Sequence, residues 1–368
     1  MAKTKINLLI AKNPSTPIDV LKALAQKKDE VVRSDVASNP STPQEVLKAL
    51  AKDSSDDVLY SVGINPNVNV DLINILLGEE YGKKGLADNP RTNQSTLDVL
   101  AKDESHQIRY KVAINPSTKI KTLITLSKDE SDLVRSGVAI NPSSPEDILI
   151  KLATEKDGDR IRAYVAQNKS APTAALDLLI KDPKESTREY AARHPNLSVS
   201  LITECATKKG KGASIKEYAA LNPSLPSELI FSLSKDKNRS VRASIASNLS
   251  APLEILEILV KDKDYEVRRN VCQHPNASEW LQAILAKDKE HYVRWFLAMN
   301  KNLGSSILEI LSKDDSARIR QSVASHSNSS PEMLELLSKD MDESVRNAVA
   351  ANPKAPLSVI NEFSGFKK

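Results

Sequence analysis

The chain has 368 residues, and its formal net charge of +4, from 52 basic and 48 acidic residues, makes no case for a nucleic-acid-binding protein by charge alone. Apolar residues make up 40% and aromatic residues 4%, which excludes a disordered chain and disfavours one large conventional core. Cys205 and Cys272 exclude a disulfide framework and lack the spacing of metal ligands, so we expect a cytoplasmic protein without a metal or other cofactor.

The N-terminal segment carries only a short apolar run before Asn13-Pro14. Such a run is too short for a secretory signal or a membrane span, so no membrane association is expected.

The dipeptide Asn-Pro, or a variant of it, recurs at a spacing of about 26 residues. This period predicts one repeat solenoid over residues 1–368, in which each unit packs on its neighbours, with a capping half-repeat at 1–13 and a capping helix at 353–368. Insertions or deletions before Asn89, Asn168 and Asn222 indicate loops or bends. The fourteen anchor residues, which bound thirteen repeats, are Asn13, Asn39, Asn65, Asn89, Asn115, Asn141, Asn168, His194, Asn222, Asn248, His274, Asn300, His326 and Asn352.

The unit from Val32 to Lys52 illustrates the elements in chain order. Its apolar residues recur every three to four positions, which predicts helices rather than strands. Thr42-Pro43-Gln44-Glu45 has the pattern of a capping box with proline at the first helical position, and so predicts a helix start. Asp53 is placed to cap the next helix, which Asn65-Pro66 ends because the residue before proline is pushed out of the helical region. Each repeat is therefore predicted to contain two short helices.

The motif of residues 32–53, VRxxVAxNPxTPxxVLxxLAxD, resembles the variant leucine-rich repeat over essentially the whole chain, and its spacing of Asp and Arg also resembles HEAT repeats. The first resemblance implies an all-α, right-handed superhelix without strands, in which the second helix of each repeat can be a 3₁₀ helix. It implies an architecture and no activity. Members of that family can carry an N-terminal cysteine-rich iron–sulfur segment, but this chain has no cysteine before Cys205, so no cluster is expected.

A basic residue stands six positions before nearly every anchor, and an aspartate precedes many of these basic residues by about six positions. The HEAT resemblance implies Asp–Arg pairing between adjacent repeats, and we interpret the column as structural. The alternative is a stripe of guanidinium groups that follows a phosphate backbone. The residues assigned to the structural column are Arg109, Arg135, Arg242, Arg268, Arg294, Arg320 and Arg346, with Asp129, Asp236, Asp262, Asp288, Asp314 and Asp340.

Four residues after the basic position, almost every repeat has Ala, with Gly63 and Cys272 as exceptions. Side chains this small predict a close approach of neighbouring backbones, and Cys272 is interpreted as an apolar filler. His194, His274 and His326 occupy the anchor position and are interpreted as substitutes for its asparagine, too far apart to share a metal ion. No arrangement of a nucleophile and a base is recognisable, so no catalytic residue is predicted.

Positions just after the basic column are free to vary, and aromatic residues gather there. Tyr164, Tyr190 and Tyr218 share one column in successive repeats, which makes them a candidate binding surface together with the basic residues Arg162, Arg188 and Lys216 and with Trp295 in an adjacent column. The alternative is that the tyrosines fill gaps created by insertions near Gly158 and residues 208–212. The basic insertion 208–212 is interpreted as a solvated loop.

Full-length repetition without a catalytic pattern predicts a non-enzymatic scaffold that binds a protein or peptide through its variable surface. The alternative is a HEAT-like array that binds nucleic acid, including one that senses DNA lesions.

Overall fold

The computed structural model describes residues 2–208 and 213–364, which form 28 α-helices and no strand. The chain divides into two compact units, Met1–Ala191 and Ala192–Lys368. The helices that lie wholly in the first unit are α1 (Ala2–Lys12), α2 (Ile18–Leu24), α3 (Glu30–Ser38), α4 (Gln44–Leu50), α5 (Asp56–Gly63), α6 (Val70–Leu76), α7 (Glu80–Asp88), α8 (Gln94–Leu100), α9 (His106–Ile114), α10 (Ile120–Leu126), α11 (Asp132–Ile140), α12 (Glu146–Leu152), α13 (Asp159–Gln167) and α14 (Thr173–Leu179).

Helix α15 (Glu185–Arg193) contains the boundary between the units. The helices that follow it are α16 (Val199–Thr207), α17 (Ala213–Ala220), α18 (Ser227–Leu233), α19 (Arg239–Ala246), α20 (Leu253–Leu259), α21 (Tyr265–Val271), α22 (Glu279–Leu285), α23 (His291–Ala298), α24 (Ser305–Leu311), α25 (Ala317–Ala324), α26 (Pro331–Leu337), α27 (Glu343–Ala351) and α28 (Leu357–Ser364).

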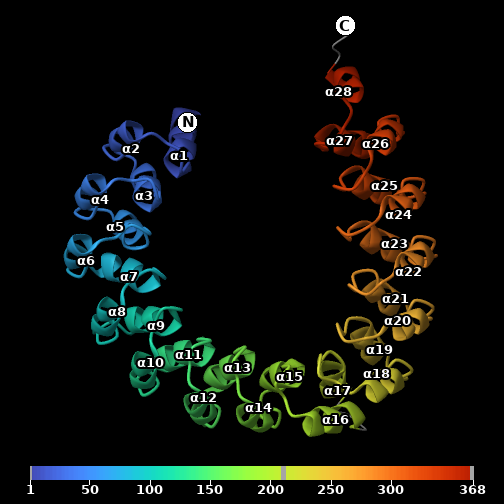
Figure 1. The fold of residues 1–368 in the computed structure, drawn as a ribbon, viewed down its shortest axis with the longest axis horizontal. Coiled ribbons are helices and arrows are strands. Elements are labelled where there is room, and N and C mark those ends of the chain that lie inside the picture. Colours follow the sequence, from blue (N-terminus) through green and yellow to red (C-terminus); the bar gives the residue numbers. More distant parts are fainter. Residues whose placement is uncertain (1, 209–212, 365–368) are drawn as a thin grey trace. The chain divides into compact units, whose positions relative to one another are not determined.

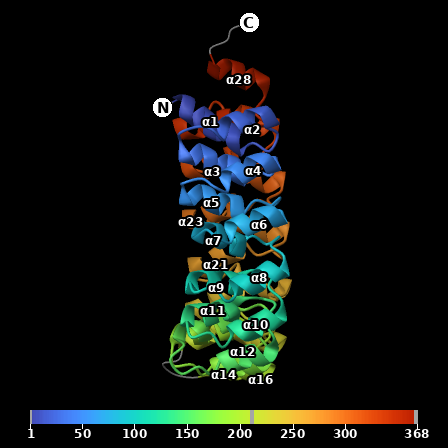
Figure 2. The same cartoon turned by 90° about the vertical axis from the view of Figure 1, so that its left-hand side faces the viewer.

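Within each unit, the odd-numbered helices stack in one row and the even-numbered helices in another (Figure 1). Figure 2 shows the two rows of the first unit side by side. We call these rows the odd row and the even row. The predicted all-α repeat solenoid is confirmed. Of the two predicted caps, segment 1–13 contains α1 and segment 353–368 contains α28. Residues 365–368 of the second segment lie outside the described part of the chain.

The 3₁₀ type expected for one helix of each pair is not found in the described residues, where both helices are α-helical. In the even row, the amides of Leu47 and Ala51 donate to the carbonyls of Pro43 and Leu47, four residues earlier, at 3.1 and 2.8 Å. Hydrogen bonds that span four residues close α-helical turns. The proline at the N-cap accepts the first of these bonds through its carbonyl, and it has no amide that would need a partner.

The capping box predicted at Thr42 is also wrong. Pro43, not Thr42, is the N-cap of α4, and no side chain caps that helix. The buried Thr42 hydroxyl instead donates to the carbonyl oxygen of Val36 near the end of α3, at 2.6 Å. The threonine therefore donates to a carbonyl at the C-terminus of α3, and Pro43 begins the next helix.

The anchor asparagines carry the contact between successive repeats. Asn141 follows α11 with an extended backbone, as expected before proline, and it is 1% exposed. Its Nδ2 donates to the carbonyls of Ala113 and Asn115 in the preceding repeat, at 2.7 and 3.1 Å, and its Oδ1 accepts the amide of Ser143 at 2.9 Å.

The same amide contact to the preceding repeat recurs in both units, and we call the set the asparagine ladder. The residues whose side-chain amides donate in this way are Asn39, Asn65, Asn89, Asn115, Asn141 and Asn168 in the first unit and Asn222, Asn248, Asn300 and Asn352 in the second. One acceptor in each case is the carbonyl of a column residue such as Ala113, which is itself fully buried. The small side chain at that position therefore leaves room for the asparagine of the next repeat.

Glycine brings two helices of the first unit especially close. A Cβ built on Gly85 of α7 would lie 2.3 Å from the carbonyl oxygen of Tyr60 and 2.9 Å from the Cα of Gly63, both on α5. No side chain fits between these backbones, so the glycine pair sets the spacing of α5 and α7.

We expect Asn141→Asp to destabilise the fold by roughly 2–5 kcal/mol, because it removes two buried amide donors and places a carboxylate against carbonyl oxygens. Asn69→Asp is the matched control, since Asn69 is an exposed N-cap that only accepts from Leu72, a role that aspartate fills equally well. Chemical denaturation of both variants measures the difference. Equal stability of the two would contradict a structural role for the ladder.

Gly85→Ala should cost at least about 2 kcal/mol, since a methyl group there forces α5 and α7 apart. Gly78→Ala is its control, because the nearest atom to a Cβ at Gly78 is the Ile75 carbonyl oxygen at 3.4 Å, an ordinary contact. The midpoint of thermal unfolding should fall for the first variant only, and a fall of similar size in both would argue against close packing at Gly85.

Candidate interaction surface

The basic column lies between repeats and is engaged there. Arg242 donates through Nε and Nη2 to both carboxylate oxygens of Asp262, at 2.6 and 2.9 Å, and through Nη1 to the carbonyls of Asp236 and Lys237, at 2.8 and 3.2 Å. Its side chain is 7% exposed and that of Asp262 is 9% exposed. In this fork geometry, groups of the protein itself accept the hydrogen bonds of the guanidinium.

The other column residues are also engaged by acceptors of the chain, most of them by a carboxylate of the next repeat. Arg109, Arg268, Arg294 and Arg320 pair with Asp129, Asp288, Asp314 and Asp340, and Arg135 pairs with Glu155. Arg346 donates to the carbonyls of Asp340 and Met341. Because these cations are engaged by acceptors of the chain itself, the pairing favours the structural interpretation of the column over a stripe for phosphates.

The tyrosines of the sequence-predicted binding surface lie on the odd row. Tyr164 on α13 is half-buried, and Tyr190 on α15 is 38% exposed. Tyr218 on α17 belongs to the second unit and is half-buried, with the Cζ of Arg193 6.0 Å from its ring centre.

The basic residues predicted beside these tyrosines are engaged in the column instead. Arg162 donates to Asp182 at 2.5 Å, and Lys216 forms an ion pair with Asp236. Arg188 donates to the carbonyls of Asp182 and Pro183, at 2.6 and 2.8 Å. The predicted loop at 208–212 lies, apart from Lys208, outside the described residues.

Three residues of the first unit form a charged cluster that the sequence does not single out. The Tyr60 hydroxyl of α5 donates to Asp88 Oδ2 of α7 at 2.7 Å, and Lys111 of α9 forms an ion pair with the same carboxylate. Lys111 Nζ also lies 5.6 Å from the Tyr60 ring centre. Burial, with the hydrogen bond to Asp88 second, raises the pKa of Tyr60 to about 12. The charges of this cluster are therefore balanced within the odd row.

The second unit presents a different cluster across α21, α23 and α25, which we call the Arg–aromatic cluster. It consists of Arg269, Phe296, Trp295 and Arg318. The Cζ of Arg269 lies 5.0 Å from the Phe296 ring centre, and the Cζ of Arg318 lies 3.8 Å from the Trp295 ring centre. The two rings meet edge to face, with centres 5.1 Å apart and an interplanar angle of 74°. Trp295 alone among the four is in the predicted site, because each ring–guanidinium contact joins side chains of two different repeats.

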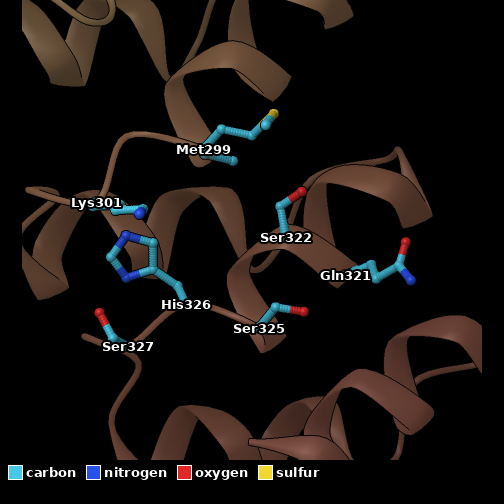
Figure 3. A pocket seen from close by; sticks show the side chains of 8 residues that line it. Met299, Lys301, Gln321, Ser322, Ser325, His326 and Ser327 are labelled. Atoms are coloured by element: carbon cyan, nitrogen blue, oxygen red, sulfur yellow. The ribbon is translucent and has the colours of Figure 1, made fainter. Parts of the chain in front are cut away.

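An open depression of about 510 Å³ lies next to this cluster, between α23 and α25 (Figure 3). Met299 is 52% exposed in it and stands four residues after Trp295, on the same face of the chain one helical turn further. Ser322 stands in the same relation to Arg318. The remaining lining residues are Ala298, Lys301, Gln321, Ser325, His326 and Ser327.

Cys272 and the anchor histidines are integrated into the packing. Burial raises the pKa of the fully buried Cys272 thiol to about 12. His274 and His326 contact the carbonyls of Asn248 and Asn300 through Nε2, at 2.8 and 3.0 Å, and so take part in the ladder. Among the described residues, no group of three or more His, Cys, Asp or Glu could hold a metal ion, and no helix is long and apolar enough to cross a membrane.

Comparisons with known proteins find no matching family model and no matching curated protein. A solved structure described as a leucine-rich repeat variant with a novel repetitive structural motif is 23% identical, and the match covers 61% of this chain and 87% of that one, with a TM-score of 0.39. Kap121p bound to Nup53p is 11% identical over 96% of this chain and 47% of its own, with a TM-score of 0.31.

The UNC-45 chaperone, described as binding and folding muscle myosin, is 12% identical over 97% of this chain and 51% of its own, with a TM-score of 0.22. The chain thus spans about half the length of each of these two proteins. The description of the first match names the repeat that the sequence of this chain resembles.

The Arg–Asp pairs make stability depend on pH. The hydrogen bonds from Arg320 hold the pKa of Asp340 below its ordinary value of 3.8, so this pair stabilises the fold above that value and loses its effect as the pH falls through the lowered pKa. Asp340→Asn should therefore cost about 2 kcal/mol near neutral pH, and the difference from the parent should narrow as the pH falls below 3.8 through the lowered pKa.

Denaturation across this pH range measures the effect, with Asp71→Asn, at an exposed position of α6, as the control. If Asp340→Asn lowers the stability of the fold by the same amount at every pH, the carboxylate of Asp340 is not the source of that stability.

Proposed function

We propose that the protein is a non-enzymatic scaffold that binds a protein or peptide through the exposed surface of its odd row. The observation that carries this proposal is the Arg–aromatic cluster, in which tryptophan and arginine, the residues most enriched in interface hot spots, lie beside an open depression. The proposal includes the cytoplasmic location expected from two free, buried cysteines.

The tyrosines on the odd row are further candidate contacts, each within its own unit. Tyr164 and Tyr190 belong to the first unit and Tyr218 to the second, so each unit contributes at least one aromatic residue from the predicted column. Because the neighbouring cations Arg162 and Lys216 are engaged in ion pairs, these tyrosines would act through their rings and hydroxyl groups.

The nucleic-acid alternative has less support from the structure. It depends on evenly spaced free cations, and the column that supplies the spacing is paired with carboxylates between repeats.

The two tryptophans allow a matched test. Trp295 lies in the odd row, whereas Trp280 is 53% exposed on α22 in the even row. Peptides selected from a displayed random library on the full chain should lose about 2 kcal/mol or more of binding free energy with Trp295→Ala and keep their affinity with Trp280→Ala. Circular dichroism controls for folding.

The proposal fails if no peptide is enriched or if both substitutions weaken binding equally. DNA binding that falls steeply with salt and survives Trp295→Ala would favour the nucleic-acid alternative.

A further inference from the structure

We infer that the Arg–aromatic cluster binds a short acidic segment of a protein partner, with one carboxylate at Arg269 and one at Arg318. This inference rests on the proposed function and specifies the chemistry of the partner that this surface recognises.

The two arginines keep hydrogen-bonding capacity beyond their ring contacts. A guanidinium has five N–H donors in a fork that matches a carboxylate. Arg318 lies against the Trp295 ring, and Arg269 lies against Phe296 with one 3.3 Å bond to Asn270 Oδ1. The ring contacts hold both side chains in place, which lowers the entropy that a ligand would have to remove on binding.

Charge complementarity points to carboxylates from outside the chain. Arg239, another odd-row arginine of the same unit, lies 3.4 Å from Asp264 and 3.6 Å from Glu266. Within the described residues, neither Arg269 nor Arg318 lies within ion-pair distance of a carboxylate. These two arginines therefore form a local site for negative charge in a unit whose other arginines are mostly paired.

The geometry favours an acidic peptide over a nucleic acid. Single-stranded nucleic acid binds by stacking bases on free aromatic faces along a continuous basic groove. Here a guanidinium covers one face of Trp295 and another lies against Phe296, and the arginine column of the same unit is engaged between repeats.

The spacing limits the length of the acidic segment. The successive separations from Arg269 to Phe296, to Trp295 and to Arg318 are 5.0, 5.1 and 3.8 Å, so the two Cζ atoms lie within about 14 Å of each other. An extended chain rises about 3.3 Å per residue and returns to the same side every second residue, so the carboxylates fit at positions up to about four apart. The adjoining depression, with Met299 exposed in it, accommodates an apolar side chain next to one of them.

The test uses the full chain with Trp280→Phe, so that Trp295 is the remaining tryptophan and its fluorescence reports on the site. The probe is the labelled peptide Gly-Glu-Ser-Leu-Ser-Glu-Gly, compared with its Gln-for-Glu version and with a single-stranded oligonucleotide. Binding is measured by fluorescence anisotropy and by the Trp295 emission. Arg269→Gln and Arg318→Gln test the site, and Arg239→Gln is the matched control on α19.

We expect saturable binding of the acidic peptide, a loss of at least tenfold with either site substitution or with the Gln peptide, and no change with Arg239→Gln. Arg318→Glu should lose the acidic peptide and gain a peptide with Lys in place of Glu, which a misfolded variant would not do. Equal affinity for the Gln peptide, no saturable binding, or arginine-dependent binding of the oligonucleotide alone would overturn the inference. Library peptides that depend on Trp295 but carry no acidic residues would also overturn it while leaving the proposed function intact.

Discussion

Each asparagine of the ladder places its amide within hydrogen-bonding distance of a main-chain carbonyl in the preceding repeat, and this requirement constrains the rest of each unit. For Asn141 the acceptors are the carbonyls of Ala113 and Asn115, both buried, where an unpaired polar group would be costly. Such an approach needs a very small side chain at the column position. It also needs a helix that ends at the asparagine, which the following proline ensures. The period, the alanine column and the Asn-Pro pair therefore all serve the same contact between successive repeats.

The same arrangement determines where variation is tolerated. The arginine column lies between repeats six residues before the ladder, and residues such as Arg242 donate to Asp262 and to main-chain carbonyls. The basic residues that look most conspicuous in the sequence are thus the least available to a partner. The outward positions of the odd row do not take part in these contacts between repeats, and at these positions the two units differ. Tyr60, Asp88 and Lys111 balance one another, whereas Arg269 and Arg318 rest on aromatic rings.

Features that recur with the period were predictable from the sequence, since a repeated residue reports a repeated environment. The helix pairs and the small column followed from it. The capping role assigned to Thr42 did not hold, because a hydroxyl at that position can reach either of two helices and the sequence does not decide between them. Of the Arg–aromatic cluster, only Trp295 was predicted from the sequence. Arg269 and Trp295 share one column but Arg318 occupies another, so the spacing of successive helices is what brings the cations onto the rings.

The candidate surface adjoins a place where the ladder is weaker. The ring Nδ1 of His326 accepts the amide of Asn328 at 3.0 Å, so its Nε2 carries the proton and donates to the carbonyl of Asn300. An imidazole has one such donor, whereas the amide of Asn352 in the next repeat donates to two carbonyls, those of Ala324 and His326. His326 therefore reproduces the turn of an asparagine with one contact fewer to the preceding repeat than Asn352 makes. Its ring lines the depression with Met299 and Ser322, so a substitution within the ladder shapes the proposed binding surface.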